Sequence, residues 1–425
     1  MNEATLLYVR QHADDDVRLL ALRGSKDAAV NMAEALQQIA GRQTARKKLP
    51  SWAVTDNILY PPHLNMEQCS SEQTARYKAA VVKRLLSENS EISKKTKNSE
   101  SSENSESSEI PTLLDLTGGF GVDFSFLAPH FAQSIYVEQQ EELCQLARHN
   151  FNVLGIRSEV VCADGTDYLH QLSHATVIFM DPARRNEHGA RTYGISDCMP
   201  DVLQLRDELL QKATYLILKL SPMLDWRKTV SDLGEQWVNE IHIVSTGGEC
   251  KELLIVLSKE KSPTPLRLIC VNDNTLFQTE YINDNTLFQT EYINTKSLPQ
   301  SGEVGGGFLY EPNASIMKAG CFAELCRVFQ VRQLAQNSHL FVSDRLVADF
   351  PGRQFRILTV ASMNKKELKE KVMPLKQANI TVRNFPLSVA ELRKRLKISE
   401  GGSNYIFATT LANGVHVLIV CQKDL

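Results

Sequence analysis

The chain has 425 residues, with 47 Lys and Arg against 50 Asp and Glu, so its formal net charge is −3. Its composition is 43% hydrophobic and 23% charged, which is typical of a globular protein of about two to four domains. These values exclude a wholly disordered chain, a collagen-like repeat and a small disulfide-stabilised protein. The sequence contains no run of about 20 apolar residues, so no membrane span is predicted. Because the net charge is close to zero, any nucleic-acid partner must be held by a local basic patch.

The N-terminus and the cysteines indicate a cytoplasmic protein. Residues 1–10 lack the basic stretch and the long apolar run of a secretion signal. The nine cysteines are odd in number and include no C-x-x-C spacing. We therefore expect reduced thiols, with neither a disulfide framework nor a metal site.

Residues 1–86 are predicted to form a helical region. Apolar side chains at helical spacing predict one amphipathic helix from Asp27 to Lys48. Ser70-Ser-Glu-Gln73 has the pattern of a capping box and predicts a second helix, and residues 52–66 between them are expected to be an ordered loop. Residues 87–110 are rich in Ser and Glu and bury too little apolar surface to offset their ordering entropy, so they predict a disordered linker.

From Pro111 onward, short apolar runs alternate with helical patterns, which is typical of βαβ units on a parallel sheet. The last two expected strands are too close in sequence for a parallel crossover and predict an antiparallel pair. Residues 111–260 are therefore interpreted as an α/β domain with a Rossmann-like sheet of seven strands. The expected strands are residues 112–116, 134–138, 159–164, 177–181, 215–219, 240–245 and 252–258.

The C-terminal part contains a tandem duplication and an excess of basic residues. Residues 272–282 and 283–293 are identical, and we expect one copy in a strand or loop and the other looped out. Residues 336–425 are expected to be a small α/β domain that ends in a hairpin with a type I′ turn at Asn413-Gly414. Residues 340–425 hold 14 Lys and Arg against 7 Asp and Glu, so this segment is strongly basic.

A glycine-rich turn, Asp115-Leu-Thr-Gly-Gly-Phe-Gly-Val-Asp123, lies between a predicted strand and a helix. Glycines in this turn allow a ligand to lie close to the backbone. The ligand would then face the free N–H groups at the start of the helix. The dinucleotide pattern G-x-G-x-x-G is incomplete, because Phe124 stands at its third glycine. A nicotinamide-dependent oxidoreductase is therefore the less favoured alternative.

Acidic residues end four successive expected strands: Asp115, Glu138, Asp164 and Asp181. Because the carboxyl ends of parallel strands meet at one edge of a sheet, we expect these acids to line one crevice. Glu138 is placed to accept hydrogen bonds from the hydroxyls of a ribose, and Asp164 from an adenine amino group. The alternative is that each acid merely caps a helix.

These residues resemble the motifs of the class I S-adenosylmethionine-dependent methyltransferases over about residues 111–258. Asp115 to Asp123 resembles their first motif, Glu138 and Asp164 match their ribose-side and adenine-side acids, and Asp181-Pro-Ala-Arg184 resembles their fourth motif. The resemblance implies S-adenosyl-L-methionine as the cofactor. The cofactor-binding residues it implies are Asp115, Thr117, Gly118, Gly119, Gly121, Asp123, Glu138, Asp164 and Gly165.

Three further segments resemble parts of RNA-modifying enzymes. Residues 67–74 are similar to the segment that closes over the cofactor in trimethylguanosine synthase and its relatives, which implies that Ser71 and Thr74 contact the cofactor. Residues 261–335 resemble a small ferredoxin-like domain, and residues 336–425 a THUMP-like domain. The THUMP-like resemblance and the basic excess together imply an RNA partner.

The fourth motif implies Asp181, Pro182 and Arg184 as catalytic residues. In this family the Asp side chain and the next backbone carbonyl accept hydrogen bonds from an exocyclic amine, and an aromatic residue stacks on the base. Here Arg184 replaces the aromatic residue, and either its guanidinium or the ring of Tyr193 could stack instead. No cysteine lies in the motif itself, so a cysteine nucleophile is not predicted.

Three other features are expected at the same edge of the sheet: the loop 184–201 as a lid, Lys219 at the end of a strand, and the turn 247–251. Lys219 could alternatively extend its amino group to solvent. The sequence thus predicts a methyltransferase acting on a base nitrogen in tRNA or rRNA. A non-catalytic RNA-binding protein on the same scaffold, and methylation of DNA or protein, stay open as alternatives.

Overall fold

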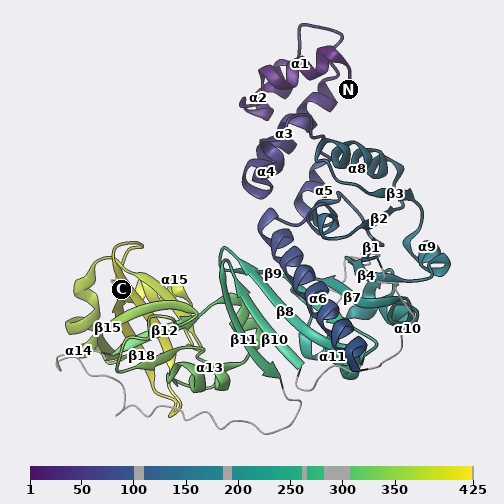
Figure 1. The fold of residues 1–425 in the computed structure, drawn as a ribbon. Coiled ribbons are helices and arrows are strands. Elements are labelled where there is room, and N and C mark those ends of the chain that lie inside the picture. The colour runs from purple at the N-terminus through teal and green to yellow at the C-terminus, as the bar shows by residue number, and fades with distance from the viewer. Residues whose placement is uncertain (100–109, 185–193, 261–265, 282–306, 424–425) are drawn as a thin grey trace. The chain divides into compact units, whose positions relative to one another are not determined.

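The computed structural model describes residues 1–99, 110–184, 194–260, 266–281 and 307–423 (Figure 1). The chain divides into two compact units. The first contains Met1–Ile241 and Glu252–Pro263, and the second contains His242–Lys251 and Thr264–Leu425. Each unit has its own packed core.

The first unit opens with the helical region that the sequence predicts. Its helices are α1 (Glu3–Gln11), α2 (Val17–Arg23), α3 (Met32–Lys48), α4 (Pro50–Ala53), α5 (His63–Gln68) and α6 (Glu72–Ser99). Helix α3 begins later than expected, because the side chain of Asn31 accepts a hydrogen bond from the N–H of Glu34 and caps it there. Short helices also replace parts of the loop expected at 52–66.

Helix α6 differs from the sequence prediction at both ends. Its cap is Ser71, whose Oγ accepts from the N–H of Thr74 at 3.2 Å, so the capping box predicted from Ser70 is wrong. Ser70 instead donates to a carboxylate oxygen of Asp123 at 2.7 Å. The helix then runs through Ser99, so residues 87–99 of the expected disordered linker are helical, and residues 100–109 lie outside the described part of the chain.

Nine strands of the described chain form one sheet in the order β11-β10-β8-β9-β7-β4-β1-β2-β3. The seven predicted strands are present, and β7, β4, β1, β2 and β3 run parallel while β9 is antiparallel to β7. Strands β10 and β11 and the turn ends of β8 and β9 belong to the second unit. The strands are β1 (Thr112–Asp115), β2 (Gln133–Glu138), β3 (Glu159–Cys162), β4 (Ala175–Met180), β7 (Ala213–Leu220), β8 (Val238–Thr246), β9 (Glu249–Leu257), β10 (Leu266–Asn272) and β11 (Thr275–Tyr281).

Helices connect these strands as expected of βαβ units. They are α7 (Val122–Leu127), α8 (Glu141–Val153), α9 (Gly165–Gln171), α10 (Val202–Lys212) and α11 (Trp226–Leu233). Two short strands, β5 (Ala183–Arg184) and β6 (Cys198–Met199), pair with each other outside the main sheet. The first copy of the duplicated segment includes β11, and the second lies outside the described residues.

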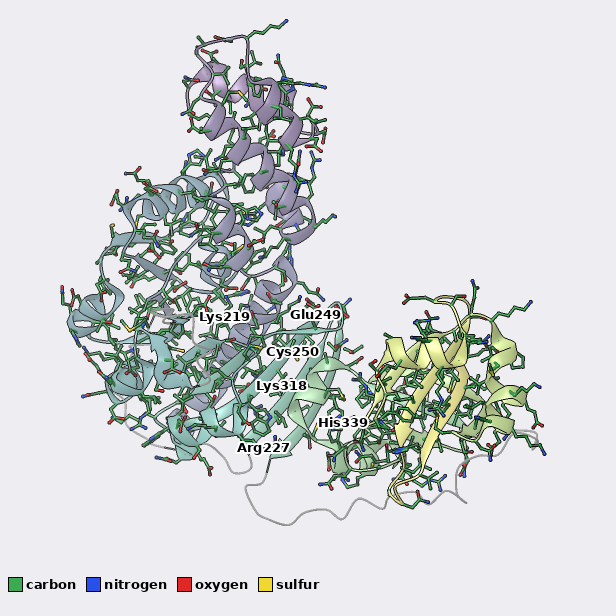
Figure 2. The ribbon with its side chains drawn as sticks, turned by 180° about the vertical axis from the view of Figure 1, so that it is seen from behind. Lys219, Arg227, Glu249, Cys250, Lys318 and His339 are labelled. Carbon is green, nitrogen blue, oxygen red and sulfur yellow. The ribbon has the colours of Figure 1, made fainter. Side chains whose placement is uncertain are left out.

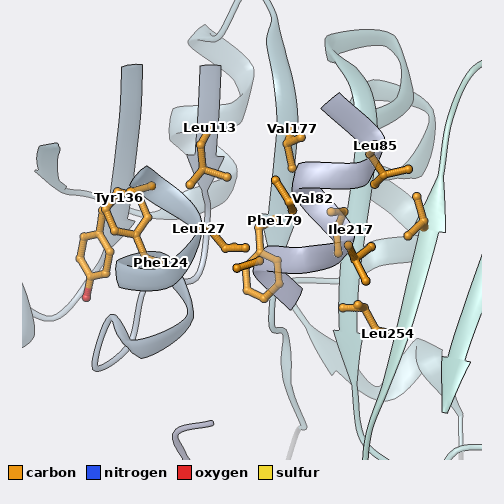
Figure 3. Packing of buried hydrophobic residues seen from close by; sticks show 14 of the residues in the cluster. Val82, Leu85, Leu113, Phe124, Leu127, Tyr136, Val177, Phe179, Ile217 and Leu254 are labelled. Atoms are coloured by element: carbon orange, nitrogen blue, oxygen red, sulfur yellow. The ribbon is translucent and has the colours of Figure 1, made fainter. Parts of the chain in front are cut away.

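The core of the first unit joins α6 and α7 to the sheet (Figure 3). Val82 and Leu85 of α6 pack on residues from β1, β4, β7 and β9, which are Leu113, Val177, Phe179, Ile217 and Leu254. Phe124 and Leu127 of α7 lie in the same cluster, and the ring of Phe124 contacts the ring of Tyr136 edge-on with centroids 5.4 Å apart. Phe124 therefore serves the core at the position where a dinucleotide-binding turn has its third glycine.

The second unit contains a seven-stranded sheet in the order β13-β14-β12-β15-β18-β17-β16. Its elements are β12 (Phe308–Pro312), α12 (Ala314–Ala319), α13 (Phe322–Phe329), β13 (Arg332–Gln333), β14 (Phe341–Ser343), β15 (Gly352–Ser362), α14 (Lys365–Glu367), the π-helix Leu368–Val372, β16 (Asn379–Arg383), α15 (Val389–Leu396), β17 (Asn404–Thr410) and β18 (His416–Gln422). Alternate residues of β17 and β18 enter two different clusters, one on each face.

The terminal hairpin is antiparallel as predicted, but its turn is not type I′. A type I′ turn needs positive φ at both central residues. Gly414 has φ 80°, while Asn413 is not among the described residues with positive φ. The N–H of Gly414 donates to the carbonyl of Leu411 at 2.9 Å, which closes the turn one residue earlier than predicted.

No helix in the described ranges is both long and apolar enough to cross a membrane.

Truncating Phe124 tests the packing of α7 on the sheet. Phe124→Ala should lower the free energy of unfolding by about 3–5 kcal/mol, because it removes a fully buried ring and leaves a cavity. Leu22→Ala is the matched control, since that side chain is 84% exposed and its loss should cost less than about 0.5 kcal/mol. Equal unfolding midpoints for the two variants in urea would contradict this assignment of the core.

Candidate active site

The strand register brings several of the predicted acids to one edge of the sheet. Asp115 lies opposite Tyr136 of β2 and Phe179 of β4, and Glu138 lies opposite Cys162 of β3. Because these strands are parallel, their carboxyl ends share an edge. Beyond that edge, the N–H of Asp181 donates to Thr117 Oγ1 at 2.6 Å, which ties the end of β4 to the glycine-rich turn.

The glycine-rich turn leaves open space at one of its glycines. Gly119 has φ 59°, and a Cβ built there would meet nothing closer than 3.8 Å. Gly118 and Gly121 are different, since a Cβ on either would collide with the ring of Tyr136 or Phe151. Phe120 turns away and packs against Trp52 with ring centroids 5.0 Å apart, so it does not fill the space beside Gly119.

Glu138 is held by the backbone around it. Its Oε2 accepts from the N–H of Gly119 and its Oε1 from the N–H of Gln140, both at 2.8 Å. Each carboxylate oxygen keeps a lone pair for a further donor. The carboxylate is therefore fixed next to the open space at Gly119, where it can accept from vicinal hydroxyls.

Asp164 caps α9 and is also exposed. Its Oδ1 accepts from the N–H groups of Thr166 and Asp167, at 2.7 and 3.2 Å, so the helix-capping alternative is correct for that oxygen. A Cβ on Gly165 would lie 2.2 Å from the carbonyl oxygen of Leu116. This close approach requires glycine and brings the start of α9 against the end of β1.

Asp115 is buried and carries an unusual acidity. The pKa of Asp115 is raised to about 8, chiefly by burial and also by the neighbouring acids Asp123, Asp181 and Glu138, while the hydrogen bond from the N–H of Thr117 acts in the opposite direction. At neutral pH this carboxyl group is therefore largely protonated unless a positive group lies beside it.

Five charged side chains of alternating sign form what we call the ionic chain: Glu252, Lys78, Asp123, Lys219 and Asp181. The Nζ of Lys78 lies 2.6 Å from Glu252 and 3.1 Å from Asp123. The Nζ of Lys219, which ends β7 (Figure 2), lies 3.6 Å from Asp123 and 2.5 Å from Asp181. Lys219 thus points inward to these acids, so the expected alternative of a solvent-directed amino group is wrong.

The ionic chain controls the ionisation of its buried members. Burial alone would raise the pKa of Asp123, but Lys78 and Lys219 outweigh it and hold that pKa below its usual value. Burial would lower the pKa of Lys219, but Asp181 and Asp123 raise it above its usual value. Both groups therefore stay charged at neutral pH.

The sequence analysis did not identify Lys78 or Glu252 as site residues. Lys78 lies on the face of α6 that also carries the buried Ala75, Val81 and Val82. A lysine on the apolar face of a helix was the available signal, because it needs an acidic partner. Its partner Glu252 is 174 residues away and shows no such pattern.

The remaining predicted residues lie around these. Thr74 is buried and donates to the carbonyl of Ser71 at 3.1 Å. Pro182 follows Asp181 and is buried. The backbone of Arg184 pairs with Cys198 in the β5–β6 ladder. Tyr193 and the loop segment 185–193 lie outside the described residues.

The residues present fit an adenosyl cofactor. The open space at Gly119, the fixed carboxylate of Glu138 and the exposed Asp164 supply acceptors for hydroxyl and amino groups. In the described ranges, no group of three or more His, Cys, Asp or Glu side chains could hold a metal ion.

Asp115→Asn tests the acidity of Asp115. A carboxyl group whose pKa is about 8 in the folded state and near 4 when unfolded stabilises the fold at low pH, and this stability is lost as the pH rises from about 4 to 8. The wild-type unfolding temperature should therefore fall more steeply between pH 5 and 8 than that of Asp115→Asn. Parallel curves in calorimetric scans would contradict the raised pKa.

Comparisons with known proteins agree with this geometry. Two family models match the second unit, one described as a ferredoxin-like domain over residues 308–351 and one described as THUMP domain-like over residues 352–423. These ranges differ from the expected 261–335 and 336–425. An uncharacterized S-adenosylmethionine-dependent methyltransferase of Mycobacterium tuberculosis (strain H37Rv) is 22% identical over 286 residues, which are 67% of this chain and 73% of that protein.

A solved structure matches almost the whole chain. The crystal structure of a candidate methyltransferase from Porphyromonas gingivalis W83 has 30% sequence identity and a TM-score of 0.79, and the match covers 99% of this chain and 98% of that one. Since the identity extends over both chains in full, and the second unit matches the THUMP-like model, the chain belongs to the class I S-adenosylmethionine-dependent methyltransferases that carry a C-terminal THUMP-like domain.

Proposed function

We propose that this methyltransferase modifies an exocyclic nitrogen of a base in RNA. The observation that carries the proposal is the position of Asp181, which directly follows β4 beside the glycine-rich turn and keeps 40% of its side chain exposed. Every other member of the ionic chain is at most 11% exposed. Asp181 is therefore the member of the chain that a substrate can reach.

Asp181 has the chemistry to hold an amine for methyl transfer. A carboxylate accepts hydrogen bonds and does not donate them, so it favours an amino group over a carbonyl oxygen. Bonds from the amine to Asp181 and to the next backbone carbonyl would fix the nitrogen and direct its lone pair outward. S-adenosyl-L-methionine supplies an electrophilic methyl group, and the residues of the site align the amine and exclude water.

The glycine-rich turn and its neighbours support the cofactor side of the site. We propose that Glu138 accepts from the ribose and Asp164 from the adenine amino group, with Gly119 leaving room for the ligand. Ser71 and Thr74 lie at the start of α6, which Ser70 links to Asp123. The hydrogen bond between Ser70 and Asp123 supports a role for the segment 67–74 beside the first motif.

The second unit supports RNA as the partner. Helix α15 and the helical segment 365–372 pack into one cluster on the same face of the seven-stranded sheet. Their exposed side chains include six basic ones beside the acidic Glu370 and Glu391, and the basic ones are Lys365, Lys366, Lys369, Lys394, Arg395 and Lys397. A basic face of this kind can contact the phosphates of a folded RNA without reading its sequence.

Glu138→Ala tests the cofactor assignment. Loss of a carboxylate that binds hydroxyls should weaken S-adenosylmethionine binding by about 10–100-fold, measured by calorimetry. Glu142→Ala is the matched control, because Glu142 is exposed on the next helix and should leave the affinity unchanged. Equal affinities for both variants would remove Glu138 from the cofactor site.

Tritium transfer tests the substrate. The purified protein, labelled cofactor and RNA from a strain lacking the gene should give label in an RNA fraction, while RNA from the parent strain accepts little. Asp181→Ala should reduce transfer by about 100-fold or more while keeping cofactor affinity within about threefold. Label that resists ribonuclease but is removed by deoxyribonuclease or protease would contradict RNA as the substrate.

A further inference from the structure

The ionic chain leads from the interior to the substrate side of the site. Glu252 and Lys78 are at most 4% exposed, Asp123 and Lys219 are about 10%, and Asp181 is 40%. The four inner groups therefore interact in a low-dielectric region, where a charge must have a partner. Within the ionic chain, Asp181 is the one member that pairs with a buried group and is itself accessible to solvent.

Lys219 lies closer to Asp181 than to Asp123, whose buried Oδ1 has no hydrogen-bond partner among the described residues. Asp123 accepts from Ser70 at 2.7 Å and lies 3.1 Å from Lys78. The distance from Lys219 to Asp123 is 3.6 Å, against 2.5 Å to Asp181 Oδ2. The shorter contact is the stronger one, and it occupies one of the two carboxylate oxygens of Asp181.

We infer that Lys219 is a positioning residue that fixes the carboxylate of Asp181 through Oδ2 and leaves Oδ1 to accept from the amino group of the substrate. Lys78, through Asp123, keeps Lys219 in place. This inference rests on the proposed function for the identity of the amino group, but the contact between Lys219 and Asp181 is independent of it. Lys219 does not touch the substrate and acts only through Asp181.

The pairing of Lys219 with Asp181 also explains how several acidic side chains can lie close together at this edge of the sheet. Without Lys219, the carboxylates of Asp123 and Asp181 would face each other, with the carboxyl group of Asp115 also close by. Asp181 would then turn toward solvent, because like charges repel and water solvates an exposed carboxylate. A neutral amide at position 181 would not need the lysine, which gives a direct test.

The test is a double-mutant cycle with Lys219→Met, Asp181→Asn and the combined variant, with Lys219→Arg as the conservative change. Lys228→Met is the control, since Lys228 is an exposed lysine that pairs with Asp232 on α11. Calorimetry measures cofactor binding, labelled transfer to RNA gives kcat and KM, and thermal scans give unfolding temperatures.

In the activity arm, Lys219→Met should lower kcat by about 30-fold or more, with cofactor affinity within about threefold of wild type. Lys219→Arg should recover most of the loss. The combined variant should be no slower than Asp181→Asn alone, because the lysine acts only through the aspartate. A wild-type kcat in Lys219→Met, or losses that multiply in the combined variant, would overturn the inference.

The stability arm decides the contact even without a substrate. Lys219→Met leaves the carboxylates of Asp123 and Asp181 near each other with no cation between them, so the combined variant should unfold about 2 °C or more above Lys219→Met. Strictly additive shifts in unfolding temperature would overturn the inference by themselves. If wild-type protein transfers no label to RNA while the unfolding temperatures are coupled, the proposed substrate fails and the role of Lys219 stands.

Discussion

The site depends on one constraint, which is that Lys78 must keep an acidic partner in the interior of the first unit. Its amino group is 1% exposed and touches both Asp123 and Glu252. These contacts tie α6 to the start of α7 and to β9, three segments that are distant in the sequence. A buried ion pair adds little net stability, but breaking one partner is costly, so the arrangement specifies how these elements meet. The position of the glycine-rich turn follows from the way in which α6, α7 and β9 are held together.

The same constraint explains how the short helix α7 is held in place. Asp123 is held from one side by Ser70 and Lys78 of the α6 segment, and Phe124 is packed between Tyr136 and Phe151. A third glycine, as in the dinucleotide fingerprint, would remove that ring from the core. The turn is therefore built with a ligand space at Gly119 and solid packing on its far side.

The strands and the acids that end them were predictable because both follow local rules. Apolar runs of strand length alternate with helices, and a parallel sheet brings its carboxyl ends together. At Ser388 the capping-box pattern forms the bonds that local rules predict, since Ser388 and Glu391 bond each other reciprocally. At Ser70 the identical pattern failed, because a tertiary partner, Asp123, took the hydroxyl that the local rule assigns to the helix.

Long-range pairings were not predictable from the sequence. The sequence marked Lys219 as a charge in an apolar run. It did not show whether the amino group reaches solvent or an acidic side chain. Lys78 and Glu252 meet only after the sheet has formed, since nothing in either local sequence refers to the other. The prediction of a type I′ turn at Asn413-Gly414 was wrong because of the strand register. The turn closes one residue earlier, and of these two residues only Gly414 has positive φ.

Glu252 connects the ionic chain to strand β9. This residue lies in β9, so the ionic chain begins on that strand. From there it continues through Lys78, Asp123 and Lys219 to Asp181. Strand β9 is therefore held by the same series of charges that holds the carboxylate of Asp181. A change that weakens the anchor at Glu252 must also weaken the hold on Asp181, because each charge in the series is balanced by its neighbours.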